Sequence, residues 1–114
     1  MNTYLPHFSC GIDAYESIAP VAGVYGKNCA LVYGEKAWAA CKEELLPALE
    51  KAGMTIVEGV CYGHEASFEN VEKLLDNQNI QNADMLFAIG GGKCIDTAKC
   101  VADRLSKPLF TVPT

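Results

Sequence analysis

Gly90, Gly91, Gly92 and Lys93 form the segment with the clearest chemical potential, between an apolar stretch and an expected helix. Three successive glycines let the backbone turn sharply and approach a ligand with no Cβ in the way. Their N–H groups, together with those of the helix start, can bind a phosphate or pyrophosphate, and the helix dipole and Lys93 add positive charge. The pattern predicts either such an anion site or a plain tight turn. It matches neither the P-loop spacing nor the G-x-G-x-x-G dinucleotide fingerprint.

Two further side chains belong to the same segment. Asp96 lies in the first turn of the expected helix, where a carboxylate suits the helix dipole or reaches the cleft as an acceptor. Cys94 lies beside Lys93 at the helix start. The positive helix end and the lysine charge both lower a thiol pKa. The hypothesis is therefore a thiol whose oxidation abolishes cofactor binding, and the alternative is an inert small residue lining the turn.

The elements around this turn alternate between strand and helix. Apolar runs predict strands at 28–33, 54–60, 85–89 and 108–112, with a further strand within 2–10. Periodic apolar positions predict helices at 35–52, 68–76 and 95–105, and a short one at 14–21. Ser67 is the expected cap of the second, and Pro47 is expected to kink or break the first. Trp38 and Phe68 lie on apolar helical faces, so both are predicted to be core residues.

Helices between strands predict a doubly wound, Rossmann-like α/β fold with a parallel sheet, in which ligands bind outside the carboxyl ends of the strands. The important strand ends are then Gly34, residues 90–93 and residues 111–114. The turn at Tyr62 and His64 lies at the same edge, as a solvated turn or a segment that approaches an adenine.

Composition limits the classes of function. The 114 residues carry nine Lys and Arg against fourteen Asp and Glu, a net charge of −5, and half are hydrophobic. This acidic balance argues against nucleic acid or an anionic membrane as partner. No apolar run has the length of a membrane span and no signal peptide is evident, so a cytoplasmic protein is expected. The six cysteines are widely spaced, as expected for mostly buried thiols in a reducing compartment rather than a zinc site.

The block from Gly90 to Lys99, with Val112, Pro113 and Thr114 after the next helix, resembles the iron-containing alcohol dehydrogenase superfamily, closest to the glycerol dehydrogenases. The resemblance covers nearly the whole chain, and Lys93 favours that branch. It implies that residues 1–114 are an NAD-binding domain like the N-terminal domain of dehydroquinate synthases, truncated at its C-terminal end.

The resemblance also implies roles for individual residues. Gly91, Gly92 and Lys93 would hold the NAD pyrophosphate, and Gly90 would belong to the same cofactor-binding turn. Asp96 would lie near the nicotinamide carboxamide, and Thr114 would contact the cofactor. Glu35 and Thr111 are weaker candidates. The family often has an acidic residue at the end of the first strand, where this chain has Gly34, so NADP is not excluded.

In the family an Asp and two His of a helical C-terminal domain hold the catalytic zinc or iron, and none of these residues lies in this chain. No catalytic and no metal-binding residue is therefore expected here. The chain would bind cofactor without catalysis, as part of a homo-oligomeric dehydrogenase that oxidises glycerol or a similar small alcohol. The alternatives are a relative acting on a 2-hydroxy acid, and a non-catalytic nucleotide-binding module.

Overall fold

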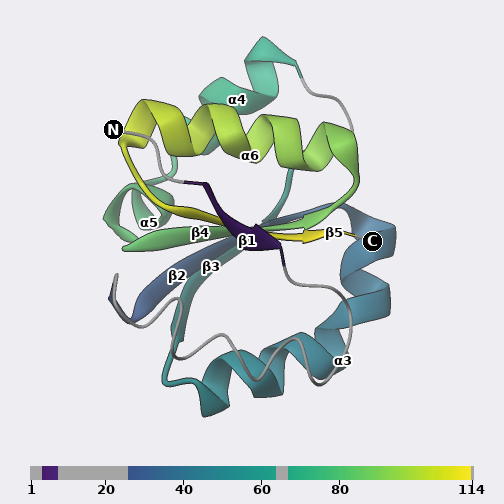
Figure 1. Ribbon diagram of the computed structural model, residues 1–114. Coiled ribbons are helices and arrows are strands. Elements are labelled where there is room, and N and C mark those ends of the chain that lie inside the picture. Colours follow the sequence, from purple (N-terminus) through teal and green to yellow (C-terminus); the bar gives the residue numbers. More distant parts are fainter. Residues whose placement is uncertain (1–3, 8–25, 64–66, 114) are drawn as a thin grey trace.

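The computed structural model describes residues 4–7, 26–63 and 67–113 of the chain (Figure 1). Five parallel strands form one sheet in the order β1-β5-β4-β2-β3. The strands are β1 (Tyr4–His7), β2 (Asn28–Tyr33), β3 (Thr55–Cys61), β4 (Met85–Gly90) and β5 (Leu109–Pro113). The helices are α3 (Glu35–Lys51), α4 (Phe68–Leu75), α5 (Gln78–Asn82) and α6 (Gly92–Leu105).

The helices cover both faces of the sheet, as the predicted doubly wound fold requires. Helix α3 lies on one face, and α4 and α6 lie side by side on the other (Figure 1). Every residue of β4 is buried, because this central strand has neighbours on both sides and a helix layer on each face. The continuous apolar run of the sequence is thus explained.

Alternate residues of the strands feed two cores. On the α3 side, Leu31 and Phe87 pack with the helix positions Cys41, Leu45 and Leu49, which follow one another at intervals of one turn. Phe87 stacks on Phe110 of β5, with ring centroids 5.1 Å apart. The other core lies between the sheet and α4 and α6, and its members include Val32, Ala88, Ala98 and Val101.

Most predicted elements are confirmed within a residue or two at their ends. The Ser67 hydroxyl caps α4 by accepting a hydrogen bond from the Asn70 N–H at 3.2 Å, as predicted. The short α5 was not predicted, because its five polar-rich residues carry no apolar period. Asn77 starts it by accepting from the N–H groups of Asn79 and Ile80. The predicted helix at 14–21 lies outside the described residues.

Expectations for three single residues had different outcomes. Helix α3 continues through Pro47 without a break, since the packing of Leu45 and Leu49 holds both halves against the sheet. Its axis changes direction between its start and its end in Figure 1, which agrees with the kink that was the other predicted outcome. Phe68 is 73% exposed rather than buried, because it is the first residue of α4 and precedes the apolar stripe at Val71 and Leu74. Trp38 is half-buried against the α3-side core and stacks on Tyr33, which agrees with its prediction.

The described cysteines divide into different classes. Cys29 and Cys94 are buried thiols, as expected, whereas Cys61 is half-buried and Cys100 is exposed; none of these four is in a disulfide. Cys41 is buried but disulfide-bonded, so the expectation of a free thiol is wrong there.

Candidate functional site

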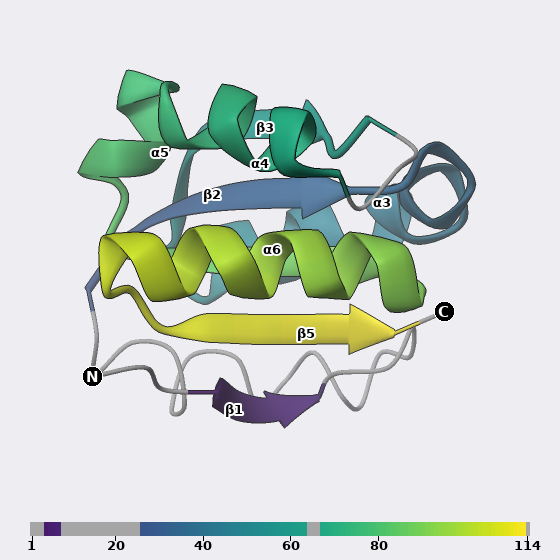
Figure 2. The same cartoon turned by 90° about the horizontal axis from the view of Figure 1, so that it is seen from above.

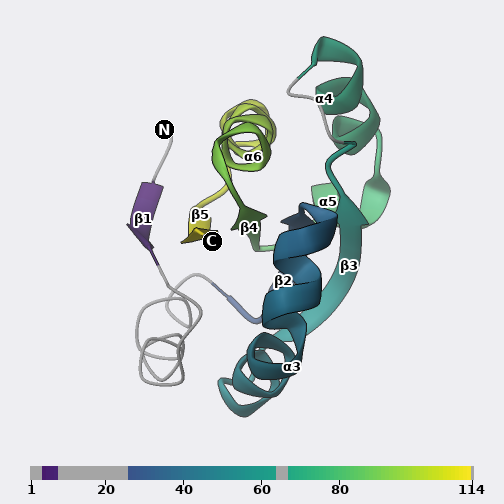
Figure 3. The same cartoon turned by 90° about the vertical axis from the view of Figure 1, so that its right-hand side faces the viewer.

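The strand order brings the two glycine-bearing strand ends together. The chain leaves β2 through α3 toward β3, but leaves β4 through α6 toward β5, in the opposite direction along the sheet. β2 and β4 therefore flank the point where the strand order reverses, which is where ligands bind in open α/β sheets. Figure 3 views the sheet along its strands and shows this order.

A backbone hydrogen bond joins these two strand ends. The Gly34 N–H donates to the Ile89 carbonyl at 3.0 Å, which holds the first residue after β2 beside the end of β4. Gly90 ends β4 with φ of 153°, a conformation that favours glycine, and turns the chain into α6. Pro113, at the end of β5, is in register with Gly90. Three of the predicted strand ends thus meet at one edge, although Thr114 lies outside the described residues.

Both helices that start at the strand-order reversal lack a capping side chain. The N-caps are Gly34 for α3 and Gly91 for α6, neither of which makes a side-chain cap hydrogen bond. By contrast, α4 and α5 begin with the capping side chains of Ser67 and Asn77. Among the described residues, side chains cap the two helices that start away from the strand-order reversal, whereas no side chain caps the first-turn backbone N–H groups at the reversal. Such groups, at the positive ends of two helices, can bind an anion.

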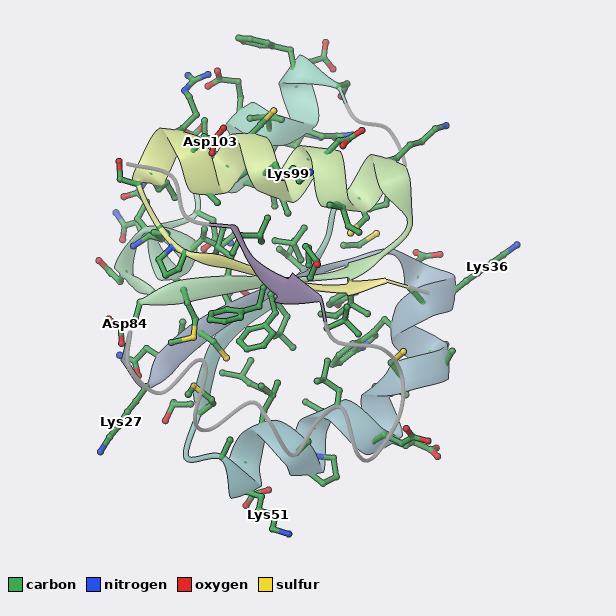
Figure 4. The ribbon with its side chains drawn as sticks, in the orientation of Figure 1. Lys27, Lys36, Lys51, Asp84, Lys99 and Asp103 are labelled. Atoms are coloured by element: carbon green, nitrogen blue, oxygen red, sulfur yellow. The ribbon has the colours of Figure 1, made fainter. Side chains whose placement is uncertain are left out.

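Two lysine side chains add positive charge near these helix starts. Lys36 and Lys93 are both exposed, and each is the second residue of its helix. Figure 4 shows Lys36 extending outward from the start of α3. A cation at a helix N-terminus opposes the dipole and costs roughly 0.3–1 kcal/mol, so these lysines do not serve helix stability. Helix α6 also has no acidic residue in its first turn to offset Lys93.

The other predicted site residues are spread more widely. Glu35 is exposed as the first residue of α3, beside Gly34. Asp96 is exposed four residues into α6, on the opposite side of that helix from the buried Cys94 and Ala98. Thr111 is only 3% exposed and pairs with Ala88 inside the sheet, short of the strand ends. The fold therefore gathers Gly90, Gly91, Gly92, Lys93 and Glu35, but not Asp96 or Thr111, at the reversal.

The hypothesis of a reactive Cys94 is wrong. Its side chain is 2% exposed, and burial raises the pKa of the thiol to about 12. Desolvation of the thiolate outweighs the helix dipole and Lys93, because both act on a sulfur facing the core rather than the solvent. The apolar series at Cys94, Ala98 and Val101 was a signal in the sequence for this inward orientation.

Tyr62 also contributes to this edge of the sheet. It is half-buried, and a Cβ added at Gly34 would lie 3.6 Å from its ring. A pocket of about 210 Å³ lies next to it on the α4 side and is lined in part by Cys61, Asn70 and Lys73. His64, which belongs to the same predicted turn, lies outside the described residues.

Two absences hold for the described part of the chain. Residues 4–7, 26–63 and 67–113 contain no group of three or more His, Cys, Asp or Glu that could hold a metal ion. None of the helices in these segments is long and apolar enough to cross a membrane.

Comparisons with known proteins agree with the fold. Glycerol dehydrogenase 1 of Schizosaccharomyces pombe is 30% identical over 88 residues, which cover 77% of this chain and 19% of that protein. A glycerol-1-phosphate dehydrogenase (NAD(P)+) of Halorubrum lacusprofundi is 50% identical over 50 residues, covering 44% of this chain and 14% of that protein. A crystal structure of glycerol dehydrogenase from S. pombe matches 97% of this chain and 27% of its own, with a TM-score of 0.77 at 22% identity.

The chain thus spans between 14% and 27% of the length of these relatives. Residues 6–114 match the sequence pattern of the family described as iron-containing alcohol dehydrogenase. Because that match covers nearly the whole chain, this chain belongs to the iron-containing alcohol dehydrogenase family.

Proposed function

We propose that this chain is the dinucleotide-binding domain of an NAD(P)-dependent dehydrogenase that oxidises glycerol, glycerol 1-phosphate or a similar small alcohol. One observation carries the proposal: two helices with uncapped glycine N-termini start side by side where the strand order reverses. Membership of the alcohol dehydrogenase family supports the reaction class. The glycerol and glycerol 1-phosphate dehydrogenases among its relatives support the substrate class.

The residues present fit a dinucleotide. A Cβ added at Gly91 or Gly92 would meet no atom of the described residues within 4 Å, so in this part of the structure both glycines leave room for a ligand to approach the backbone. The N–H groups of Gly92 and Lys93, in the first turn of α6, would bind the pyrophosphate, and the Lys93 ammonium would balance its charge. When bound, the nicotinamide supplies a hydride acceptor for the alcohol.

Gly34 bears on the choice of cofactor. With no side chain at the end of β2, this position offers no carboxylate for an adenosine ribose hydroxyl and none to repel a 2′-phosphate. Glu35 is the nearest acidic residue in the chain. We propose that NAD is the main cofactor and that NADP also binds.

The catalytic zinc or iron and the alcohol would be held by residues outside this chain, as the family resemblance implies. The described residues carry no step of the oxidation itself; they bind and orient the cofactor. The cytoplasmic location, the homo-oligomeric state and the roles of Asp96, Thr111 and Thr114 stay predictions.

Calorimetric titration of the purified chain with ADP-ribose, NAD and NADP tests the cofactor proposal. We expect saturable binding of ADP-ribose and NAD, and weaker binding after Gly92→Ala, whose methyl group enters the open space of the site. Alanine is also the better helix former of the two, so the change does not favour unfolding of α6, and a thermal melt of the variant checks this.

Gly59→Ala is the matched control, since its Cβ would make only an ordinary contact of 3.6 Å with Tyr33 and leave the glycine-rich turn unchanged. Absence of binding for all three nucleotides would overturn the proposal in favour of a module that binds no dinucleotide. The substrate class is tested separately, by comparing glycerol, glycerol 1-phosphate and a 2-hydroxy acid as substrates of the complete enzyme.

A further inference from the structure

The thiol of Cys94 lies directly beneath the glycine-rich turn. Its Sγ is 3.4 Å from the carbonyl oxygen of Ile89 and 3.5 Å from that of Val32. The thiol is protonated at neutral pH because burial raises its pKa to about 12, so it can donate to either oxygen. Cys94 therefore bridges the carboxyl ends of β4 and β2, one on each side of the strand-order reversal.

The Ile89 carbonyl is the shared acceptor of this arrangement. It receives the Gly34 N–H at 3.0 Å as well as the Cys94 thiol. The N-cap of α3 and the third residue of α6 are thus tied to one oxygen atom. A shift of the Cys94 side chain would therefore displace the backbone at the starts of both helices.

Packing between Cys94 and Gly90 is equally close. A Cβ added at Gly90 would lie 3.0 Å from Cys94 Cβ and 3.2 Å from Cys94 Sγ, so the side chain fills the space that this glycine leaves. The path of the backbone through Gly90 therefore follows the shape of Cys94. Gly91 and Gly92, which come next, have open space on their other side.

We propose that Cys94 is a positioning residue: its buried thiol holds the backbone of Gly90, Gly91 and Gly92 in the conformation that binds the dinucleotide. The expected effect of Cys94 on dinucleotide affinity rests on the proposed function. Its expected effect on the conformation of the turn does not. It replaces the predicted redox role of this cysteine, since the sulfur acts through shape and hydrogen bonding.

The test compares Cys94→Ala with Cys29→Ala. Cys29 is also free and fully buried, but it lies at the start of β2, at the opposite edge of the sheet. Both changes remove one buried sulfur and should lower stability in urea. Only Cys94→Ala should speed amide hydrogen exchange at Gly91 and Gly92, measured by NMR, and weaken ADP-ribose binding by about three- to tenfold, the size of one hydrogen bond. Cys94→Ser keeps a donor at the site and should recover part of that affinity.

Each outcome decides a separate point. If Cys94→Ala matches Cys29→Ala in both exchange and affinity, the residue is merely part of the core and the inference fails. If the unmodified chain binds no ADP-ribose while Cys94→Ala still loosens the turn, the conformational role stands and the proposed function fails. If the chain binds and only Cys94→Ala weakens binding, both hold.

Discussion

Replacing Gly91 with Asp should stabilise the fold and weaken cofactor binding at the same time. Gly91, with φ −90° and ψ −163°, is in the same extended region of backbone conformation as Ser67, with φ −101° and ψ 157°, whose hydroxyl caps α4. An aspartate can adopt this extended conformation, and a Cβ there meets no atom of the described residues within 4 Å. Its carboxylate would accept from the first-turn N–H groups of α6, which are the groups assigned to the pyrophosphate.

The substitution is expected to raise the stability of the fold and to lower the affinity for the cofactor. A capping Asp in place of Gly adds a few tenths of a kcal/mol, and its charge at the positive helix end adds about 0.3–1 kcal/mol. The melting temperature should therefore rise by roughly 2–5 °C. A carboxylate about 5 Å from a phosphate charge costs about 3 kcal/mol at an effective dielectric constant of 20. Because Gly91 is exposed, screening reduces this to about 1–2 kcal/mol, or roughly five- to thirtyfold in Kd.

Thermal melts and ADP-ribose titrations at low and high salt measure both effects, with Gly91→Asn as the matched variant. Asparagine has the same size and caps helices equally well, but it carries no charge. Gly91→Asp should bind more weakly than Gly91→Asn, and the difference should shrink as salt is added. Equal affinity of Gly91→Asp and the unmodified chain would refute the placement of the anion at this helix start.

Other predictions concern the scaffold. Asp84, at the opposite end of the sheet from Lys36 (Figure 4), accepts two backbone N–H groups at the start of β2, each at 3.0 Å, so Asp84→Ala should lower the free energy of unfolding in urea by about 1 kcal/mol. Hydrogen bonds from Asn77 and Asn79 lower the pKa of Glu58, so its stabilising effect is complete above the unfolded-state pKa and lost as pH falls through the lower folded value. Urea melts of Glu58→Gln between neutral and acidic pH should lack that part of the pH dependence; an unchanged profile would contradict it. Phe87→Ala should cost about 3–5 kcal/mol in the same assay, whereas the exposed Phe68→Ala should change stability by less than about 0.5 kcal/mol.

Local patterns predicted most of the elements. The strand at Asn28–Tyr33 was predicted at its observed ends, because an apolar run bounded by Gly34 needs no information from elsewhere in the chain. The start of α4 was predicted for a similar reason, since the Ser67 cap acts within its own turn. Phe68 was wrongly predicted, because its position ahead of the apolar stripe leaves it exposed. At Pro47 the sequence left a kink and a break open, and packing on the sheet holds α3 through the proline without a break.

For the candidate site, too, some features follow from local sequence and others only from the tertiary structure. The sequence by itself determined that a glycine-rich turn with a following lysine joins an apolar strand to a helix, since glycine content and apolar period are properties of neighbouring residues. The tertiary structure alone decided that α3 and α6 lie on opposite faces of the sheet. Figure 2 views the sheet from the face that α6 covers, so that α6 lies in front of the strands. Strand pairing sets that arrangement, because hydrogen bonds and side-chain packing between distant segments place Gly34 beside Ile89. The same packing turned Cys94 into the core, where its sulfur supports the turn instead of reacting.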